Sequence, residues 1–204
     1  MGKGEYITGL FIEPNQSFRN IRIENELSAY QKAVGGYIEC IDLPNGATII
    51  CNEEGKINGL PLNRALRDEN GEILDIIAGN MVIVGFNAEE GEFASLTEEQ
   101  SEELKKMFCF PEMFFKYNDT IHAISIEYPL ERVGTDIIFT DRRTGETAYT
   151  INCKSVDECY ALLGFISNMR DEMIMNLNSA HSDIEIGSSD IGCDTANIPF
   201  DESR

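Results

Sequence analysis

The order in which strand-like and helix-like patterns follow one another limits the fold of this chain most. Residues 6–14 and 17–24 are rich in β-branched and aromatic residues and are bounded by turn residues, so both are predicted strands. Helical spacing then begins at residue 27, and Gly35-Gly36 predicts its end. Strands and helices do not alternate regularly enough for a doubly wound sheet. We therefore predict an α+β fold with two small, mainly antiparallel sheets, each packed by helices.

A β-hairpin is predicted between residues 37–43 and 47–53. The intervening Asn45-Gly46 is a favoured two-residue turn, because both residues tolerate a positive φ. A tight turn would place Cys40 opposite Cys51 on one face of the hairpin. We interpret this pair as two small buried thiols, since free cysteines are commonly buried. A redox switch is the alternative.

The strongest helix signal lies between residues 95 and 108, after a buried strand predicted at residues 81–86. Thr97 as N-cap and Gln100 three residues later form a capping box. Glu98 and Glu99 then lie in the first turn, where the helix dipole favours negative charge.

The second half of the chain repeats this logic on a smaller scale. Three strands are predicted at residues 120–128, 135–140 and 147–153. A second capping box at Ser155–Glu158 opens a long helix that is expected to end near Asn176. Five apolar residues at helical spacing are assigned to its core face: Tyr160, Leu163, Ile166, Met169 and Met173.

The segment 109–119 marks the predicted domain boundary. It is aromatic and contains proline, which is typical of a packed joint and not of a free linker. We predict an N-terminal α+β domain at 1–110 and a hairpin plus long-helix unit at 111–177. An acidic tail with few apolar residues follows at 178–204, and it is predicted to be flexible.

Charge is the compositional property furthest from average. The chain has 36 acidic and 16 basic residues, a net charge of -20 and a pI near 4.3. Such a surface repels the phosphates of nucleic acids and anionic lipids, so direct nucleic-acid binding and membrane binding are not expected. Basic protein partners fit this charge. The alternative is that the acids serve only to keep the protein soluble.

Localisation is predicted from what the sequence lacks. No apolar leader follows Met1, and no apolar run approaches membrane-spanning length. The six cysteines form no C-x-x-C pair that would indicate a zinc ribbon. A cytoplasmic protein with reduced thiols is the simplest expectation.

Catalytic patterns are also missing from the sequence. The two histidines, His122 and His181, have no evident partner, and no phosphate-binding glycine motif is present. Paired carboxylates carry no information in so acidic a chain. We therefore expect no enzymatic activity, no cofactor and no metal site, and a hydrolase acting through carboxylates is only a residual alternative.

The loop "CNEEGKINGLPLNRAL" at residues 51–66 is the clearest candidate for a ligand site. Gly59 permits a positive φ and Pro61 fixes its own, so the backbone is held in a defined bend. The donors of Arg64 could bind a carboxylate or a phosphate. The candidate ligand-binding residues are Asn52, Asn63, Arg64, Arg67 and Asp75. Alternatively, Asn63 caps a short helix at residues 64–69 and Arg64 pairs with a local acid.

Three motifs in order resemble a family of uncharacterised domains. They are "VGGYIEC" at 34–40, "CNEEGKINGLPLNRAL" at 51–66 and "DIIAGNMVIVG" at 75–85. The resemblance covers about residues 7–110 and is to domains associated with phages and mobile elements of gut bacteria. It implies a genetic context but no activity. The second half, from Pro111, lies outside it and could hold a partner-specific surface.

Two functional hypotheses follow. In the first, a non-enzymatic accessory protein of a phage or mobile element inhibits a host defence system, of the antirestriction or anti-CRISPR type. It would do so by binding a basic nucleic-acid-binding protein such as a nuclease. The candidate contact residues are Glu89, Glu90, Glu92, Glu98, Glu99, Glu102 and Glu103. In the second, the Asn63-Arg64 loop binds or sequesters a nucleotide or metabolite.

Overall fold

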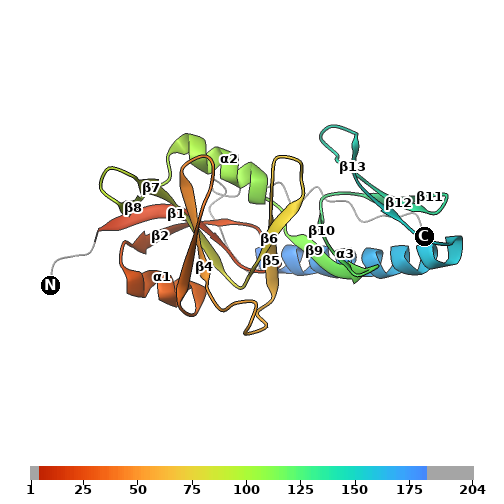
Figure 1. Ribbon diagram of the computed structural model, residues 1–204, viewed down its shortest axis with the longest axis horizontal. Helices are drawn as coiled ribbons and strands as arrows, with labels where there is room; N and C mark the ends of the chain where they lie inside the picture. The colour runs from red at the N-terminus through yellow and green to blue at the C-terminus, as the bar shows by residue number, and fades with distance from the viewer. Residues whose placement is uncertain (1–4, 183–204) are drawn as a thin grey trace. The chain divides into compact units, whose positions relative to one another are not determined.

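The computed structural model describes residues 5–182 of the 204-residue chain, which divide into two compact units (Figure 1). The first unit runs to Pro111 and the second begins at Glu112. The predicted acidic tail lies, from residue 183 onward, outside the described residues.

An antiparallel six-stranded sheet forms the centre of the first unit. Five strands follow the order β2-β1-β7-β4-β3, and β8 pairs with the free part of β7. The strands are β1 (Tyr6–Ile12), β2 (Arg19–Glu24), β3 (Ile38–Asp42), β4 (Ala47–Asn52), β7 (Met81–Asn87) and β8 (Glu92–Ala94). Two local hairpins, β1–β2 and β3–β4, therefore flank β7, which pairs with β1 on one side and β4 on the other.

Both faces of this sheet are covered, which explains the uninterrupted apolar run of β7. Met81 to Val84 are completely buried, and alternate residues belong to two different core clusters. Helix α1 (Leu27–Val34) packs on one face, where Tyr30 and Val34 are buried. Helix α2 (Glu98–Phe108) packs on the other through Leu104 and Phe108 (Figure 1).

A separate two-stranded sheet joins β5 (Leu62–Arg67) to β6 (Ile73–Ala78). Ile77 of β6 packs into the same core cluster as α2. The α+β class with small antiparallel sheets is thus confirmed. The described strands form four sheets, however, and not the two that the sequence predicts.

The helix ends follow the local sequence signals. Gly35 ends α1 in the left-handed region with a φ of 76°. At the start of α2 both bonds of the predicted capping box are present. The Gln100 amide donates to Thr97 Oγ at 3.2 Å, and the Thr97 amide donates to Gln100 Oε1 at 3.0 Å.

The register of the β3–β4 hairpin differs from the prediction by one residue. Cys40 pairs with Ile50, and Cys51 pairs with Glu39. Leu43 donates its amide to the Ala47 carbonyl at 2.8 Å, so the connection has three residues and not two. The extra residue turns Cys40 outward, where it is exposed, while Cys51 is buried. The interpretation as a facing pair of buried thiols is therefore wrong.

The second unit contains two further antiparallel sheets and one long helix. Strands β9 (Glu112–Tyr117) and β10 (Thr120–Ser125) form a hairpin. A three-stranded sheet contains β11 (Leu130–Val133), β12 (Asp136–Thr140) and β13 (Thr147–Asn152). Of these five strands, β9 and β11 have no counterpart in the sequence prediction.

Helix α3 (Val156–Ser182) extends beyond its predicted end near Asn176. Ser155 Oγ accepts the Glu158 amide at 3.2 Å, which supplies one of the two predicted capping bonds. Ile166 is completely buried as predicted, but Tyr160 is 55% exposed, so its assignment to the core is wrong. Within residues 156–179 of this helix, the buried polar residue is Arg170, whose Nε donates to the Ile126 carbonyl at 2.8 Å.

None of the helices between residues 5 and 182 is long and apolar enough to cross a membrane.

Candidate functional site

The predicted ligand loop ends in a strand, not in a helix. Asn63 and Arg64 lie on β5, so the alternative in which Asn63 caps a short helix is wrong. The β5–β6 register shifts between Leu62 and Arg64, which places Asn63 at an irregularity of the ladder. A bulge of this kind allows two consecutive side chains to turn inward. Both Asn63 and Arg64 are only 1% exposed.

Asn63 connects β5 to two other segments of the first unit. Its Nδ2 donates to the carbonyl oxygen of Ile12, at the end of β1, at 3.0 Å. The same nitrogen donates to the carbonyl oxygen of Gly79, in the turn before β7, at 2.8 Å. These bonds give two backbone carbonyls, one at the end of a strand and one in a turn, a buried donor.

Arg64 extends this arrangement to the end of α2. Its Nη2 donates to the carbonyl oxygens of Gln16, at 2.8 Å, and Phe108, at 3.2 Å. Its Nη1 donates to the carbonyl oxygen and Oδ1 of Asn63, at 2.9 and 3.0 Å. We call these two side chains and their carbonyl partners the Asn63–Arg64 clamp, because they tie β5 to β1, to the loop after β1 and to α2.

The remaining predicted ligand residues do not gather around the clamp. Asn52 is buried and donates Nδ2 to the Val34 carbonyl at 3.3 Å. Asp75 is half-buried and forms an ion pair with Lys56 at 2.6 Å. Arg67, three residues after Arg64, is exposed. The structure thus gives Asn63 and Arg64 internal partners and distributes the other candidates over different surroundings.

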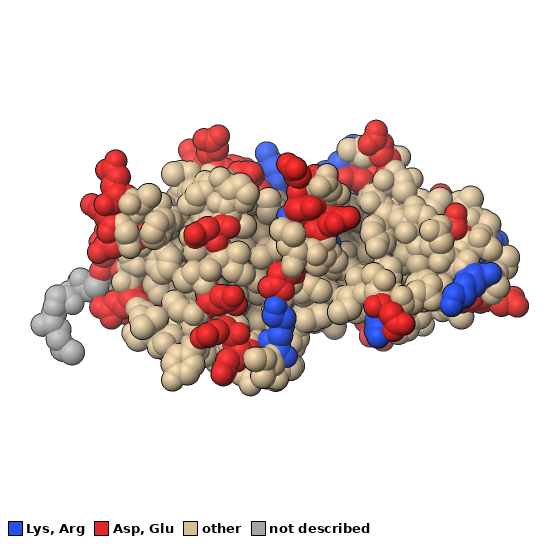
Figure 2. Space-filling model, viewed as in Figure 1, with Lys and Arg blue, Asp and Glu red and all other residues tan. Residues whose placement is uncertain are grey.

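The glutamates predicted to contact a partner form an exposed acidic surface in the first unit. They occupy the β7–β8 turn, the start of β8 and α2, and no lysine or arginine occurs between Phe86 and Leu104. In Figure 2 acidic side chains gather where Figure 1 places this turn and α2. We call these residues the acidic strip: Glu89, Glu90, Glu92, Glu98, Glu99, Glu102 and Glu103, all exposed.

Most of the acidic strip has no cation beside it. Glu102 pairs with Lys105 at 3.5 Å, and Glu103 accepts Asn45 Nδ2 at 3.0 Å. In the described part of the chain, no ion pair involves the other five: Glu89, Glu90, Glu92, Glu98 and Glu99. Their charges add to an unneutralised negative potential that can attract a cationic partner.

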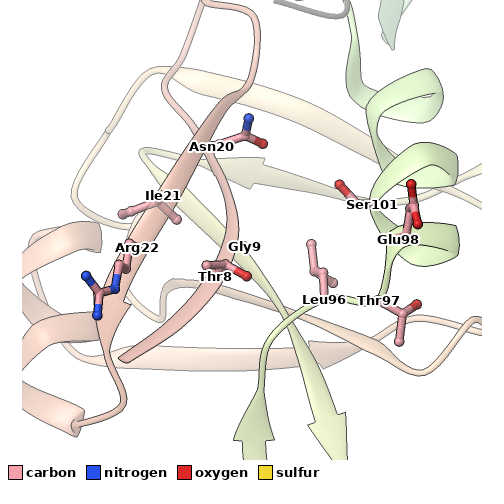
Figure 3. A pocket seen from close by; sticks show the side chains of 9 residues that line it. All are labelled: Thr8, Gly9, Asn20, Ile21, Arg22, Leu96, Thr97, Glu98 and Ser101. Atoms are coloured by element: carbon pink, nitrogen blue, oxygen red, sulfur yellow. The ribbon is translucent and has the colours of Figure 1, made fainter. Parts of the chain in front are cut away.

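An open depression of about 550 Å³ borders the strip at the start of α2 (Figure 3). Asn20 of β2 and Ser101 of α2 lie on its opposite walls, with Leu96 between them. Arg22 points away and lies over the Tyr6 ring at 4.7 Å. The sequence prediction missed this depression, because strands and a helix far apart in the chain build it. Its polar side chains are exposed or half-buried, so it is a surface feature and not an enclosed ligand site.

His122 in the second unit belongs to an aromatic cluster. Its ring stacks on Phe115 with centroids 5.2 Å apart, and Nδ1 lies 3.1 Å from the Tyr149 hydroxyl. Burial lowers the pKa of His122, so the ring is neutral at physiological pH. Within residues 5–179, no group of three His, Cys, Asp or Glu side chains is placed to hold a metal ion.

The acidic strip and the clamp both fall inside a recognised sequence family. A family model described as "Domain of unknown function (DUF3846)" matches residues 7–109. The chain belongs to this family. The DUF3846 match ends two residues before the first unit does, so the second unit lies outside it. Neither the curated proteins nor the solved structures include a significant match.

The segment Leu-Pro-Leu-Asn-Arg, which supplies the clamp residues, lies within the matched residues 7–109. The motif fixes β5 against the central sheet through bonds to distant carbonyls. A signal for this role exists in the sequence, since Arg64 is a cation in an acidic chain and is followed by the apolar Ala65 and Leu66. The carbonyls that it would bind could not be identified without the fold.

Proposed function

We propose that this chain is a non-enzymatic acidic protein that binds a basic, nucleic-acid-binding protein through the acidic strip. One observation carries the proposal: seven exposed glutamates lie on neighbouring elements of one unit, with no lysine or arginine between Phe86 and Leu104. A strip of this kind presents carboxylates to a groove that otherwise holds phosphates. Binding there would compete with nucleic acid for the same cations.

The partner that fits this chemistry best is a nuclease of a host defence system. Such a protein must expose a basic groove to bind nucleic acid irrespective of its sequence. The resemblance to domains of phages and mobile elements supports the same choice. Occupying the groove would inhibit the nuclease without any catalytic step in this chain.

The small-ligand alternative has less support from the geometry. Arg64 directs its guanidinium to carbonyl oxygens inside the first unit, and its side chain is 1% exposed. A ligand that required Arg64 would first have to replace these internal bonds.

Two sets of substitutions with equal change in net charge test the proposal. Glutamine replaces four glutamates of the strip in one variant and four exposed glutamates elsewhere in the first unit in the other. The strip variant carries Glu98→Gln, Glu99→Gln, Glu102→Gln and Glu103→Gln. The matched control carries Glu53→Gln, Glu54→Gln, Glu69→Gln and Glu72→Gln.

Each tagged chain is incubated with nuclease-treated host lysate, and captured proteins are identified and then purified. We expect the wild type and the control variant to hold a basic nuclease at low salt and to release it as salt or DNA is added. The strip variant should bind that purified protein at least about tenfold more weakly. Equal weakening by both variants would show that only net charge matters, and the proposed surface would be wrong.

A further inference from the structure

A second open hollow in the first unit has more apolar side chains in its lining than the depression of Figure 3, although about half of its surface is polar. It has a volume of about 320 Å³ and lies between the start of α1, the start of β3 and the β7–β8 hairpin. Four apolar side chains and two acids line it: Leu27, Ile38, Phe86, Phe93, Glu5 and Glu92. We call it the β8 groove.

The walls of the β8 groove are tied together by one residue, Asn25. Its amide donates to the Glu5 carbonyl at 2.7 Å, and its Nδ2 donates to the Phe93 carbonyl at 2.8 Å. Its Oδ1 accepts the Tyr30 hydroxyl at 2.7 Å. These bonds join the residue before β1 to β8 and α1, so the groove is organised before any partner arrives and costs little to order on binding.

The same bonds determine which chemistry the groove offers. The Tyr30 hydroxyl is already bonded, and its ring meets Phe93 edge-on with centroids 5.3 Å apart. The apolar side chains remain available to a ligand, since Leu27 is 58% exposed and Phe86 is 45% exposed. Exposed apolar area beside a preformed hollow is typical of a site for an apolar anchor side chain.

Charge determines what surrounds that anchor in the partner. Among the described residues, the charged side chains that line the groove are the carboxylates of Glu5 and Glu92, and Glu92 also belongs to the acidic strip. A second copy of this chain, with its own net charge of -20, would be repelled. A partner segment with lysine or arginine beside an apolar residue would satisfy both the acids and the apolar walls.

We propose that the β8 groove binds a basic peptide segment that inserts an apolar side chain between Leu27 and Phe86. This inference rests on the proposed function, because it assigns to the basic partner a segment that docks next to the strip. The strip attracts the partner, and the groove selects among basic partners by requiring an anchor. A partner with cations alone would associate through the strip but would dissociate faster.

Three fluorescein-labelled synthetic peptides test the groove without the natural partner. The first places a central Phe-Leu pair between lysines, the second replaces that pair with serines, and the third replaces the lysines with glutamates. Binding to the full chain is measured by fluorescence anisotropy, and amide chemical shifts report the site. Leu27→Ser and Phe86→Ser remove groove contacts. Ile57→Ser, at a side chain that is 87% exposed and outside the groove, is the matched control.

We expect the first peptide to bind best and to shift the amides of α1 and β8. Leu27→Ser and Phe86→Ser should each weaken it about tenfold, and Ile57→Ser should leave it unchanged. If the serine peptide binds as tightly as the first, or the first does not bind, the groove inference is wrong.

The strip variant separates this failure from a failure of the proposed function. Peptide binding that falls in the strip variant but not in the groove variants would leave the strip proposal standing alone. If the affinity for the nuclease is unchanged in the strip variant and is also unchanged by added salt, the proposed function itself is wrong.

Discussion

Replacing Arg64 with methionine should destabilise the first unit strongly although no ligand is involved. Methionine retains an unbranched side chain but removes the guanidinium, which leaves the Gln16 and Phe108 carbonyls without their donor. Leaving a buried carbonyl unsatisfied costs about 1–3 kcal/mol, and the Phe108 carbonyl is buried while that of Gln16 is partly buried. We therefore expect the free energy of unfolding to fall by about 3 kcal/mol. The same change at the exposed Arg67 should cost less than about 0.5 kcal/mol.

Native-state hydrogen exchange is the suitable assay, because the chain has two units whose unfolding transitions can differ. Slowly exchanging amides of β7, such as that of the completely buried Ile83, report the unfolding of the first unit. Amides of α3 serve as an internal reference for the second unit. If Arg64→Met lowers the protection of β7 no more than Arg67→Met does, the clamp has no structural role. The residue would then again be a candidate for ligand binding.

Three further predictions concern other residues of the first unit. Gly9→Ala should cost about 2–3 kcal/mol in thermal or urea unfolding, because the added Cβ would lie 2.2 Å from a carbonyl oxygen of β7; unchanged stability would contradict this close approach. N-ethylmaleimide should modify the exposed Cys40 in the native protein. The reaction should be faster at higher pH, because partial desolvation of the sulfur and then the charges of Asp42 and Glu39 raise its thiol pKa. Cys51, with a pKa raised to about 11 chiefly by burial, should react only after unfolding, and equal labelling of both would refute the hairpin register. Burial alone would raise the pKa of Asp75, but its hydrogen bond to Lys56 lowers it below the ordinary value of 3.8. The ionised pair thus adds less than about 1 kcal/mol of stability above that pH, and the difference between wild type and Asp75→Asn should vanish as the pH falls through the lowered pKa.

Local signals predicted the elements that depend on neighbouring residues. The capping box of Thr97 and the terminating glycine of α1 act within one helical turn, so the sequence alone identifies them. The continuous apolar run of β7 likewise indicates a strand that is buried on both faces. The hairpin at Asn45-Gly46 was also predicted, but its register depended on one additional loop residue.

The orientation of Asn63 and Arg64 could not be predicted in the same way. Their bonds reach carbonyls at Ile12, Gln16 and Phe108, which the fold alone brings near β5. A polar pair after Leu-Pro has the appearance of a surface loop when those partners are unknown. The acidic strip was easier to predict than the clamp, because a segment without any lysine or arginine is negatively charged whatever its position in the fold. What that charge binds stays a prediction.

The central place of β7 has a consequence for synthesis on the ribosome. The β1–β2 and β3–β4 hairpins form from sequence neighbours, but the sheet joins them only through a strand that begins at Met81. At about 5–20 residues per second, the emerging chain must wait several seconds with two unconnected hairpins, each showing an unpaired apolar edge. A nascent chain halted before residue 81 should therefore be sensitive to protease and prone to aggregate. Release of β7 from the exit tunnel should convert both hairpins into one protected sheet in a single step.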